Sequence, residues 1–460
     1  MPVGVGVERG ASNAPEVSFR EALRVWVRVA ALSFGGPAGQ IAVMHRILVE
    51  EKRWISERRF LHALNYCMLL PGPEAQQLAI YVGWLLHRTT GGLVAGTLFV
   101  VPGFLSILAL SILYVGFQQI LLVQAVFFGI KAAVLAIVVD AVMRIGRRAL
   151  AGRQHYALAA GAFVALFMFQ VPFPVVILSA GLIGLAHAIP TRHDTLPEGA
   201  VGDVGVVDAV AAASRFDHTR PSLARAVRVA SIGLCLWLVP TVALNVALGS
   251  GHVFSQVATF FSTMAVVTFG GAYAVLAYVA QQGVEHYGWL QPGEMLDGLG
   301  MAETTPGPLI QVVQFVAFLA AFREPGSMDP YEAALLASVL AAWVTFVPCF
   351  VWIFLGAPYV ESLRANWRAN AALSSITAAV VGVVLNLSVW FSMHVLFARV
   401  ESVVIPGGAI SIPVWRTLDV PAAALAAGAL FALLRRRWGM MATLAMTTGA
   451  GMLLYLLVQQ

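Results

Sequence analysis

Two Pro-Gly-Pro triplets are the best candidates for a binding site in this sequence. They are Pro71-Gly72-Pro73 and Pro306-Gly307-Pro308. Proline disfavours helical backbone in the residue before it and glycine relaxes the chain, so each triplet should end one helix and let another begin. The first turn of a helix carries unpaired N–H groups and the positive end of the helix dipole. Such a turn is suited to hold an anion.

Further hydrogen-bond donors are predicted beside the triplets. Gln76 and Gln311 follow the two triplets at the same spacing, and their amides can donate to an oxyanion without the cost of burying a full charge. Each glutamine could equally form a structural bond between helices. The pairs Gly35-Gly36 and Gly270-Gly271 would add exposed backbone donors. The alternative for each glycine pair is that small residues only allow close helix packing.

Ionisable residues inside apolar segments are the next candidates. Lys131 is predicted to lie mid-helix, where an unpaired charge costs about 3 kcal/mol or more, so it is a candidate counter-charge for an anionic substrate. Glu74, Asp140 and Glu303 are candidates for proton coupling, because burial would favour their neutral forms. The three cysteines stand singly and show no metal-ligand spacing, so neither a metal nor a cofactor is predicted.

The two triplets belong to an internal repeat. Ser33-Phe34-Gly35-Gly36 recurs as Thr268-Phe269-Gly270-Gly271, and Trp54 recurs as Trp289 at the same offset. Apolar matches would arise by chance in so hydrophobic a chain, but recurring glycine pairs, tryptophan and Pro-Gly-Pro would not. The chain is therefore predicted to contain two homologous modules. Duplication around broken helices is typical of secondary transporters.

Composition places these modules in a membrane. The chain is 59% hydrophobic and 11% charged, whereas about a quarter of the residues of a soluble domain are charged. Backbone groups in lipid must bond within their own segment, so we predict an all-α polytopic membrane protein. No basic tract is interleaved with aromatic residues, so nucleic-acid binding is not expected. The apolar runs long enough to cross a bilayer core of about 30 Å are Gly92–Phe117, Gln119–Met143, Ser222–Leu248, Ala333–Gly356 and Ala369–Phe391.

The chain divides into five predicted parts. A first module (17–190) and a second module (250–460) flank a charged linker (191–220) and an unmatched transmembrane helix (221–248), and a short N-terminal tail (1–16) precedes them. We expect no removable signal peptide, because arginines and not an apolar core follow the tail.

Arginine and lysine positions predict that the modules lie in opposite orientations. The connection 51–59 carries four basic residues, whereas its copy at 286–294 carries neither lysine nor arginine. By the positive-inside rule the N-terminus and the linker are cytoplasmic, and the unmatched helix supplies the odd crossing that inversion requires. Basic residues on both sides of each first-module break favour re-entrant segments. The alternative is a full-length helix kinked by proline.

These motifs resemble the chromate ion transporter family in its long, two-domain form. The resemblance rests on Phe34-Gly35-Gly36-Pro37, Trp54 and Pro71-Gly72-Pro73, together with their second-module copies. It implies a protein of the bacterial inner membrane that exports chromate, driven by the membrane potential or a proton gradient, and so confers chromate resistance. It implies a transporter and not an enzyme.

Two alternatives to chromate export stay open. A permease for sulfate or another tetrahedral oxyanion would keep the fold and change the substrate. A membrane-embedded enzyme is disfavoured, because the chain lacks a dinucleotide-binding glycine motif and any haem or iron–sulfur spacing. The sequence also leaves open whether copies of the chain form a homo-oligomer.

Overall fold

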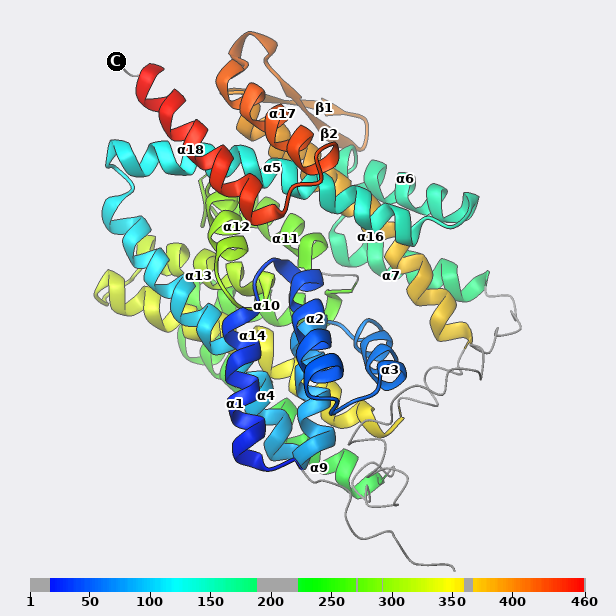
Figure 1. Ribbon diagram of the computed structural model, residues 1–460. Coiled ribbons are helices and arrows are strands. Elements are labelled where there is room, and N and C mark those ends of the chain that lie inside the picture. Colours follow the sequence, from blue (N-terminus) through cyan, green and yellow to red (C-terminus); the bar gives the residue numbers. More distant parts are fainter. Residues whose placement is uncertain (1–16, 188–221, 270–271, 292, 360–366, 459–460) are drawn as a thin grey trace, which may run out of the picture.

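The computed structural model describes residues 17–187, 222–269, 272–291, 293–359 and 367–458 (Figure 1). The predicted N-terminal tail (1–16) and the whole of the predicted linker (191–220) lie outside these residues. In the described part, six helices are long and apolar enough to cross a membrane. The remaining elements are shorter helices and one two-stranded sheet. The predicted all-α polytopic membrane fold is therefore confirmed.

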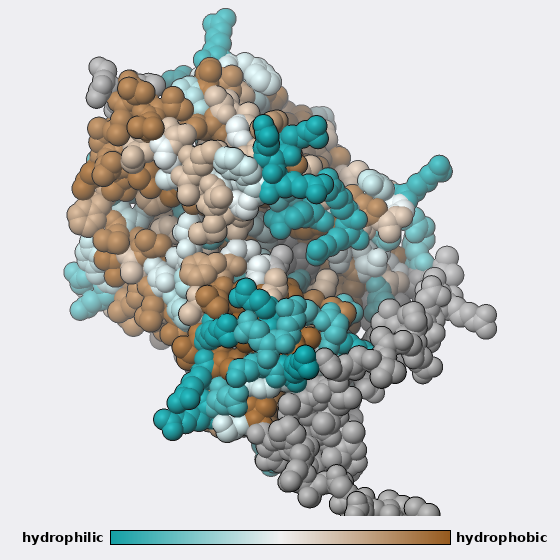
Figure 2. Space-filling view, viewed as in Figure 1, coloured by the Kyte–Doolittle hydropathy of each residue, from teal (hydrophilic) through white to brown (hydrophobic). Residues whose placement is uncertain are grey.

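The first module begins with short helices and ends with longer apolar ones. Helix α1 is amphipathic: Ser18 caps it by accepting from the Glu21 amide, and its arginines lie on the exposed face. The space-filling view shows a polar area over α1 to α3 and a largely apolar surface at the upper left (Figure 2). In chain order the elements are α1 (Phe19–Leu32), α2 (Gly36–His45), the π-helical η1 (Arg46–Glu51), α3 (Glu57–Cys67), α4 (Glu74–Phe117), α5 (Leu121–Ala149), α6 (Arg153–Phe167) and α7 (Phe173–Ala186).

Helix α4 is a hairpin and not one straight span. His87 and Arg88 leave helical backbone angles, and Arg88 has a φ of 54°. The two arms fold back on one another closely enough that a Cβ on Gly83 would lie 2.4 Å from the Gly91 carbonyl oxygen. The first arm is therefore a half-helix that starts at the Pro-Gly-Pro triplet. In the second module a loop between α13 and α14 takes the place of this turn.

The second module repeats this order after the unmatched helix α9 (Leu223–Leu248). Its first part is α10 (Val253–Val267), α11 (Ala272–Gln281), the π-helical η3 (Gln282–His286), α12 (Glu294–Thr304), the 3-10 turn η4 (Leu309–Gln311), α13 (Val312–Arg323) and α14 (Pro330–Gly356). Its second part is η5 (Ala357–Tyr359), α16 (Trp367–Leu396), β1 (Val400–Ile405), β2 (Gly408–Pro413), η6 (Trp415–Thr417), α17 (Val420–Leu434) and α18 (Met440–Val458).

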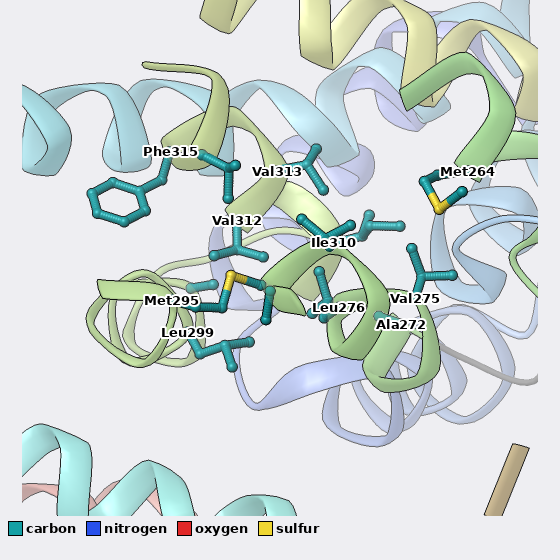
Figure 3. Packing of buried hydrophobic residues seen from close by; sticks show 14 of the residues in the cluster. Met264, Ala272, Val275, Leu276, Met295, Leu299, Ile310, Val312, Val313 and Phe315 are labelled. Carbon is teal, nitrogen blue, oxygen red and sulfur yellow. The ribbon is translucent and has the colours of Figure 1, made fainter. Parts of the chain in front are cut away.

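The broken helices of the second module form the main hydrophobic core. Side chains of α10 to α13 interdigitate there, including Met264, Leu276, Met295 and Phe315 (Figure 3). Helix α12 is buried along nearly its whole length, whereas the matching α3 has exposed charged residues. Helices α3 and α12 thus hold matching places in the two modules, but only α12 is buried along nearly its whole length.

The modules exchange their last helix pairs. Helices α6 and α7 pack against α16 of the second module, while α17 and α18 pack against α5 of the first. Figure 1 shows α18, in red, lying across α5, in cyan. Glycines allow this close approach: a Cβ on Gly129 would lie 2.6 Å from Thr448 Cα, and one on Gly382 would lie 2.0 Å from the Ala159 carbonyl oxygen. The modules are therefore interlocked.

A β-hairpin between α16 and α17 was not expected from the sequence. Strands β1 and β2 pair antiparallel with Val403 opposite Ile410, and Gly407 takes a φ of 85° in the turn. Alternating apolar residues around Pro-Gly-Gly are the signal that sequence reasoning missed.

Candidate anion-binding site

The helix breaks of the two modules meet through a reciprocal pair of hydrogen bonds. The Gly72 amide donates to the Thr268 carbonyl at 2.8 Å, and the Gly307 amide donates to the Ser33 carbonyl at 3.0 Å. Ser33 and Thr268 each directly precede the Phe-Gly-Gly of their own module. The Pro-Gly-Pro triplet of one module is thus joined to the glycine-pair break of the other.

Both triplet glycines are required by conformation and by packing. Gly72 and Gly307 have φ values of 116° and 106°, which side-chain-bearing residues rarely adopt. A Cβ on Gly307 would lie 3.0 Å from Gly103 Cα on α4, and one on Gly72 would lie 2.9 Å from Cys349 Sγ on α14. Since the amides of both glycines are already bonded, a ligand would meet the first-turn amides that follow them.

The two triplets start their helices differently. Pro73 is the N-cap of α4, whereas Pro308 is the N-cap of the 3-10 turn η4, which continues into α13. The second proline of each triplet therefore lies one residue before the first helical position. Its missing N–H costs nothing there, because a cap residue donates no intrahelical bond.

The glutamines after the triplets are buried but unequal. Gln76 is fully buried, and neither its amide nitrogen nor its amide oxygen has a partner within the described residues. Gln311 donates to Gln314 Oε1 at 2.6 Å, and its own oxygen is unpaired. Gln77 donates to the Pro71 carbonyl at 2.7 Å and so braces the first triplet. A buried unpaired amide is costly, so Gln76 is the donor best suited to a ligand.

A third glutamine bridges the modules. Gln40 of α2 donates from Nε2 to the Gly307 carbonyl. Its copy in the second module is Val275, which cannot make this bond.

The first glycine pair faces an acid from the other module. Gly35 caps α2 with a φ of 84°, and Gly36 follows with a φ of 68°. A Cβ on Gly36 would lie 3.8 Å from Glu303 Oε2. The other predicted pair, Gly270 and Gly271, lies outside the described residues.

The sequence of this chain is similar to those of known proteins. The chain matches the model of the chromate transporter family over residues 20–185 and 255–455. The chain belongs to the chromate transporter family. A chromate transport protein of Pseudomonas aeruginosa is 31% identical over 373 residues, covering 80% of each chain. One from Cupriavidus metallidurans is 27% identical over 373 residues, covering 81% of this chain and 82% of the relative. No solved structure matches.

Membership of the chromate transporter family and the long apolar helices make this a multi-pass membrane transport protein. Among the described residues, no group of three or more histidines, cysteines and acids is placed to hold a metal ion.

Lys131, the predicted counter-charge, is paired with an acid that sequence reasoning did not select. Its Nζ lies 3.2 Å from Asp297 Oδ2 on α12, and Tyr114 of α4 donates to the same oxygen at 3.0 Å. Asp297 is buried and its Oδ1 has no partner in the described part of the chain. The signal for Asp297 was present, because a lysine within an apolar helix requires an acid nearby.

A row of charges on α5 leads toward the helix breaks. Asp140, Arg144 and Arg148 are spaced four residues apart and so share one face, and Arg144 Nε binds Asp140 Oδ2 at 2.7 Å. Electrostatic interactions link Arg144 to Glu303 and Arg148 to Glu74. The Arg144 side chain is half exposed. The structure thus brings the three predicted coupling acids near two arginines of α5.

Proposed function

We propose that this protein exports chromate across the bacterial inner membrane and binds it where the helix breaks of the two modules meet. The reciprocal hydrogen bonds of Gly72 and Gly307 carry this proposal, because each joins a Pro-Gly-Pro break of one module to a break of the other, and the Tyr273–Glu303 bond lies between the two pairs. A tetrahedral dianion needs several donors at once, and helix starts with adjacent amide side chains supply them. The chromate transport proteins of Pseudomonas aeruginosa and Cupriavidus metallidurans support the choice of chromate.

The first-turn amides after the triplets, those at the start of α2 (Gly35-Gly36) and the side chain of Gln76 are the primary ligands in this proposal. Gln76 needs no rearrangement, because both of its polar side-chain atoms lack partners in the described structure. Gln311 and Lys131 assist only after they exchange present partners, Gln314 and Asp297, for the anion. Glu74 and Asp140 are candidate coupling groups beside the α5 arginines.

Export against a gradient follows from the charge of the substrate. The cytoplasm is electrically negative, so moving an anion outward is favoured by about 2.3 kcal/mol per charge for each 100 mV. The half-exposed Arg144 and the exposed Arg148 on α5 would attract a dianion toward the helix breaks. We place these arginines, the N-terminus and the linker (191–220) on the cytoplasmic side by the positive-inside rule. Expulsion of chromate would confer resistance to it.

Alternating access is the proposed transport cycle. The reciprocal bonds and the exchanged helix pairs are the contacts expected of two modules related by approximate two-fold symmetry, as in transporters built from repeats. Together with the reversed arginine bias, this relationship supports opposite orientation of the modules in the membrane. Rocking of the breaks about this axis would open the cluster to one side and then to the other.

Flux measurements on the purified chain test the proposed function. The protein is reconstituted into proteoliposomes that hold radiolabelled chromate, and a potassium diffusion potential, negative inside, is imposed with valinomycin. We expect efflux that rises with the potential and is absent from protein-free vesicles. Sulfate is then enclosed in excess together with chromate inside the vesicles. If sulfate leaves at a rate equal to or higher than that of chromate, sulfate and not chromate is the substrate of this protein. If neither anion leaves, the proposal is refuted.

A further inference from the structure

The carboxyl group of Glu303 lies in the cluster of helix breaks with one oxygen unpaired. Glu303 is in the last turn of α12 and is only 1% exposed. Tyr273 of α11 donates its hydroxyl hydrogen to Glu303 Oε1. Glu303 Oε2 has no hydrogen-bond partner in the described residues and faces Gly36, where a Cβ would lie 3.8 Å away. The free oxygen is therefore directed at the first residue of α2.

The start of α2 is suited to an anion, and this acid lies beside it. Gly35 is the cap of α2, which is ten residues long, and Pro37 lies in its first turn. The amides of a first helical turn lack acceptors within the helix, and the helix dipole favours negative charge beside them. An acid of the second module thus lies where the first module would bind an oxyanion.

Few charged groups reach Glu303 from the surrounding elements. Arg144 acts on it electrostatically from α5, where it is paired with Asp140, and Tyr273 acts through its hydrogen bond. Several ionisable groups on the neighbouring elements have other partners: Lys131 and Tyr114 contact Asp297, Arg323 contacts Glu294, and His45 contacts Glu50 and Glu57. Burial favours the neutral form of Glu303, and Tyr273 and Arg144 act against it by favouring the charged form.

We propose that Glu303 is a built-in competitor of the transported oxyanion at the start of α2. In the unloaded protein its carboxylate occupies this helix start. A dianion and a carboxylate cannot share the position, because like charges at such short distance repel strongly. The acid takes up a proton from the aqueous phase as the dianion binds and returns it when the dianion leaves. This inference rests on the proposed function and adds to it the uptake of a proton when the dianion binds.

The exchange has a consequence for binding that does not depend on flux. Binding of the dianion and of the proton are thermodynamically linked, so each favours the other. The protein should take up roughly one proton for each oxyanion bound when Glu303 begins ionised. The complex then carries one unit of negative charge less than the dianion brings.

Isothermal titration calorimetry measures this proton uptake directly. Chromate is titrated into the purified full-length protein in detergent, in buffers of different ionisation enthalpy, at a pH where chromate is fully dianionic. The wild type should take up roughly one proton per chromate, and Glu303→Gln should take up none while still binding. Glu285→Gln is the matched control, because Glu285 contacts Trp390 and Gln281 away from the helix breaks, and it should behave as the wild type.

Tyr273→Phe tests the inference independently if Glu303→Gln fails to fold. Loss of this hydroxyl donor makes Glu303 easier to protonate, so proton uptake at the same pH should fall and chromate should bind more tightly. Wild-type binding without proton uptake, or equal uptake by Glu303→Gln, would overturn this inference and leave the proposed export standing. No chromate binding by the wild type would instead refute the proposed function.

Discussion

The carbonyl oxygen of Ser33 accepts a hydrogen bond from the Gly307 amide, with 3.0 Å between the two atoms. The bond joins the glycine-pair break of one module to the Pro-Gly-Pro break of the other, and the Gly72–Thr268 bond completes the pair. The two interruptions of each module are therefore held together by the other module. Substitutions at this junction should affect both modules at once.

Gly307→Ala should destabilise the folded protein. The φ of 106° at Gly307 costs a residue with a side chain about 1–3 kcal/mol, and the new Cβ would lie 3.0 Å from Gly103 Cα. Thermal unfolding in detergent should show a clear loss of stability. Gly116→Ala is the control, because nothing lies within 4 Å of its Cβ position and alanine favours a helix. Equal stability of the two variants would contradict the tight junction.

Gln76→Ala should weaken chromate binding without lowering stability. Gln76 has no partner in the described structure to lose, but a hydrogen bond to a charged ligand is worth about 1.5–3 kcal/mol, or roughly tenfold to hundredfold in affinity. Gln77→Ala should lower stability without weakening chromate binding, because Gln77 donates to the Pro71 carbonyl and not to the ligand. Calorimetric binding and thermal unfolding of both variants provide the comparison. Unchanged chromate affinity in Gln76→Ala would remove this side chain from the site.

Lys131→Met should destabilise the protein mainly through Asp297. The substitution leaves a buried carboxylate without its cation, and breaking such a pair costs about 3 kcal/mol. The double variant Lys131→Met/Asp297→Asn should recover most of this loss, since the amide oxygen can still accept from Tyr114. Unfolding temperatures of the single and double variants measure the recovery. A Lys131→Met variant of normal stability that has lost transport would instead favour Lys131 as the substrate counter-charge.

Cysteine labelling from either side of the membrane should show opposite orientation of the modules. Gly152→Cys lies in the α5–α6 connection, and Ser402→Cys lies in the matching α16–α17 connection. In a Cys235→Ser background, which removes the exposed native thiol, an impermeant maleimide should label residue 152 only from the cytoplasm and residue 402 only from the periplasm. Labelling of both from one side would refute the inverted arrangement.

Hydrophobic patterning and the repeat predicted most of the long helices and the positions of the breaks. Apolar runs of sufficient length have few alternatives in a membrane, and Pro-Gly-Pro can hardly continue a helix. Helices α6 and α7 pack against α16 of the other module, and α17 and α18 pack against α5. This exchange depends on the shapes of helix surfaces far apart in the sequence, so local sequence does not predict it. The turn at Arg88 lies between the predicted break at Pro71-Gly72-Pro73 and the predicted apolar run that begins at Gly92.

Contacts between modules were the least predictable part of the site. Asp297 and Lys131 lie far apart in the sequence, so their pairing follows only from the fold. Gln76 and Gln311 looked equivalent by register, yet only Gln311 has Gln314 as a partner. Symmetry of sequence thus predicted the framework, while the differences between copies decide which residues are free to bind.

A chromium anomalous difference map of chromate-soaked crystals tests the central claim most directly. We predict one strong peak within hydrogen-bonding reach of the Gln76 amide and the first-turn amides that follow Pro73. The same peak should weaken in crystals of Gln76→Ala. A peak remote from both Pro-Gly-Pro triplets and from Gly36 would contradict the account.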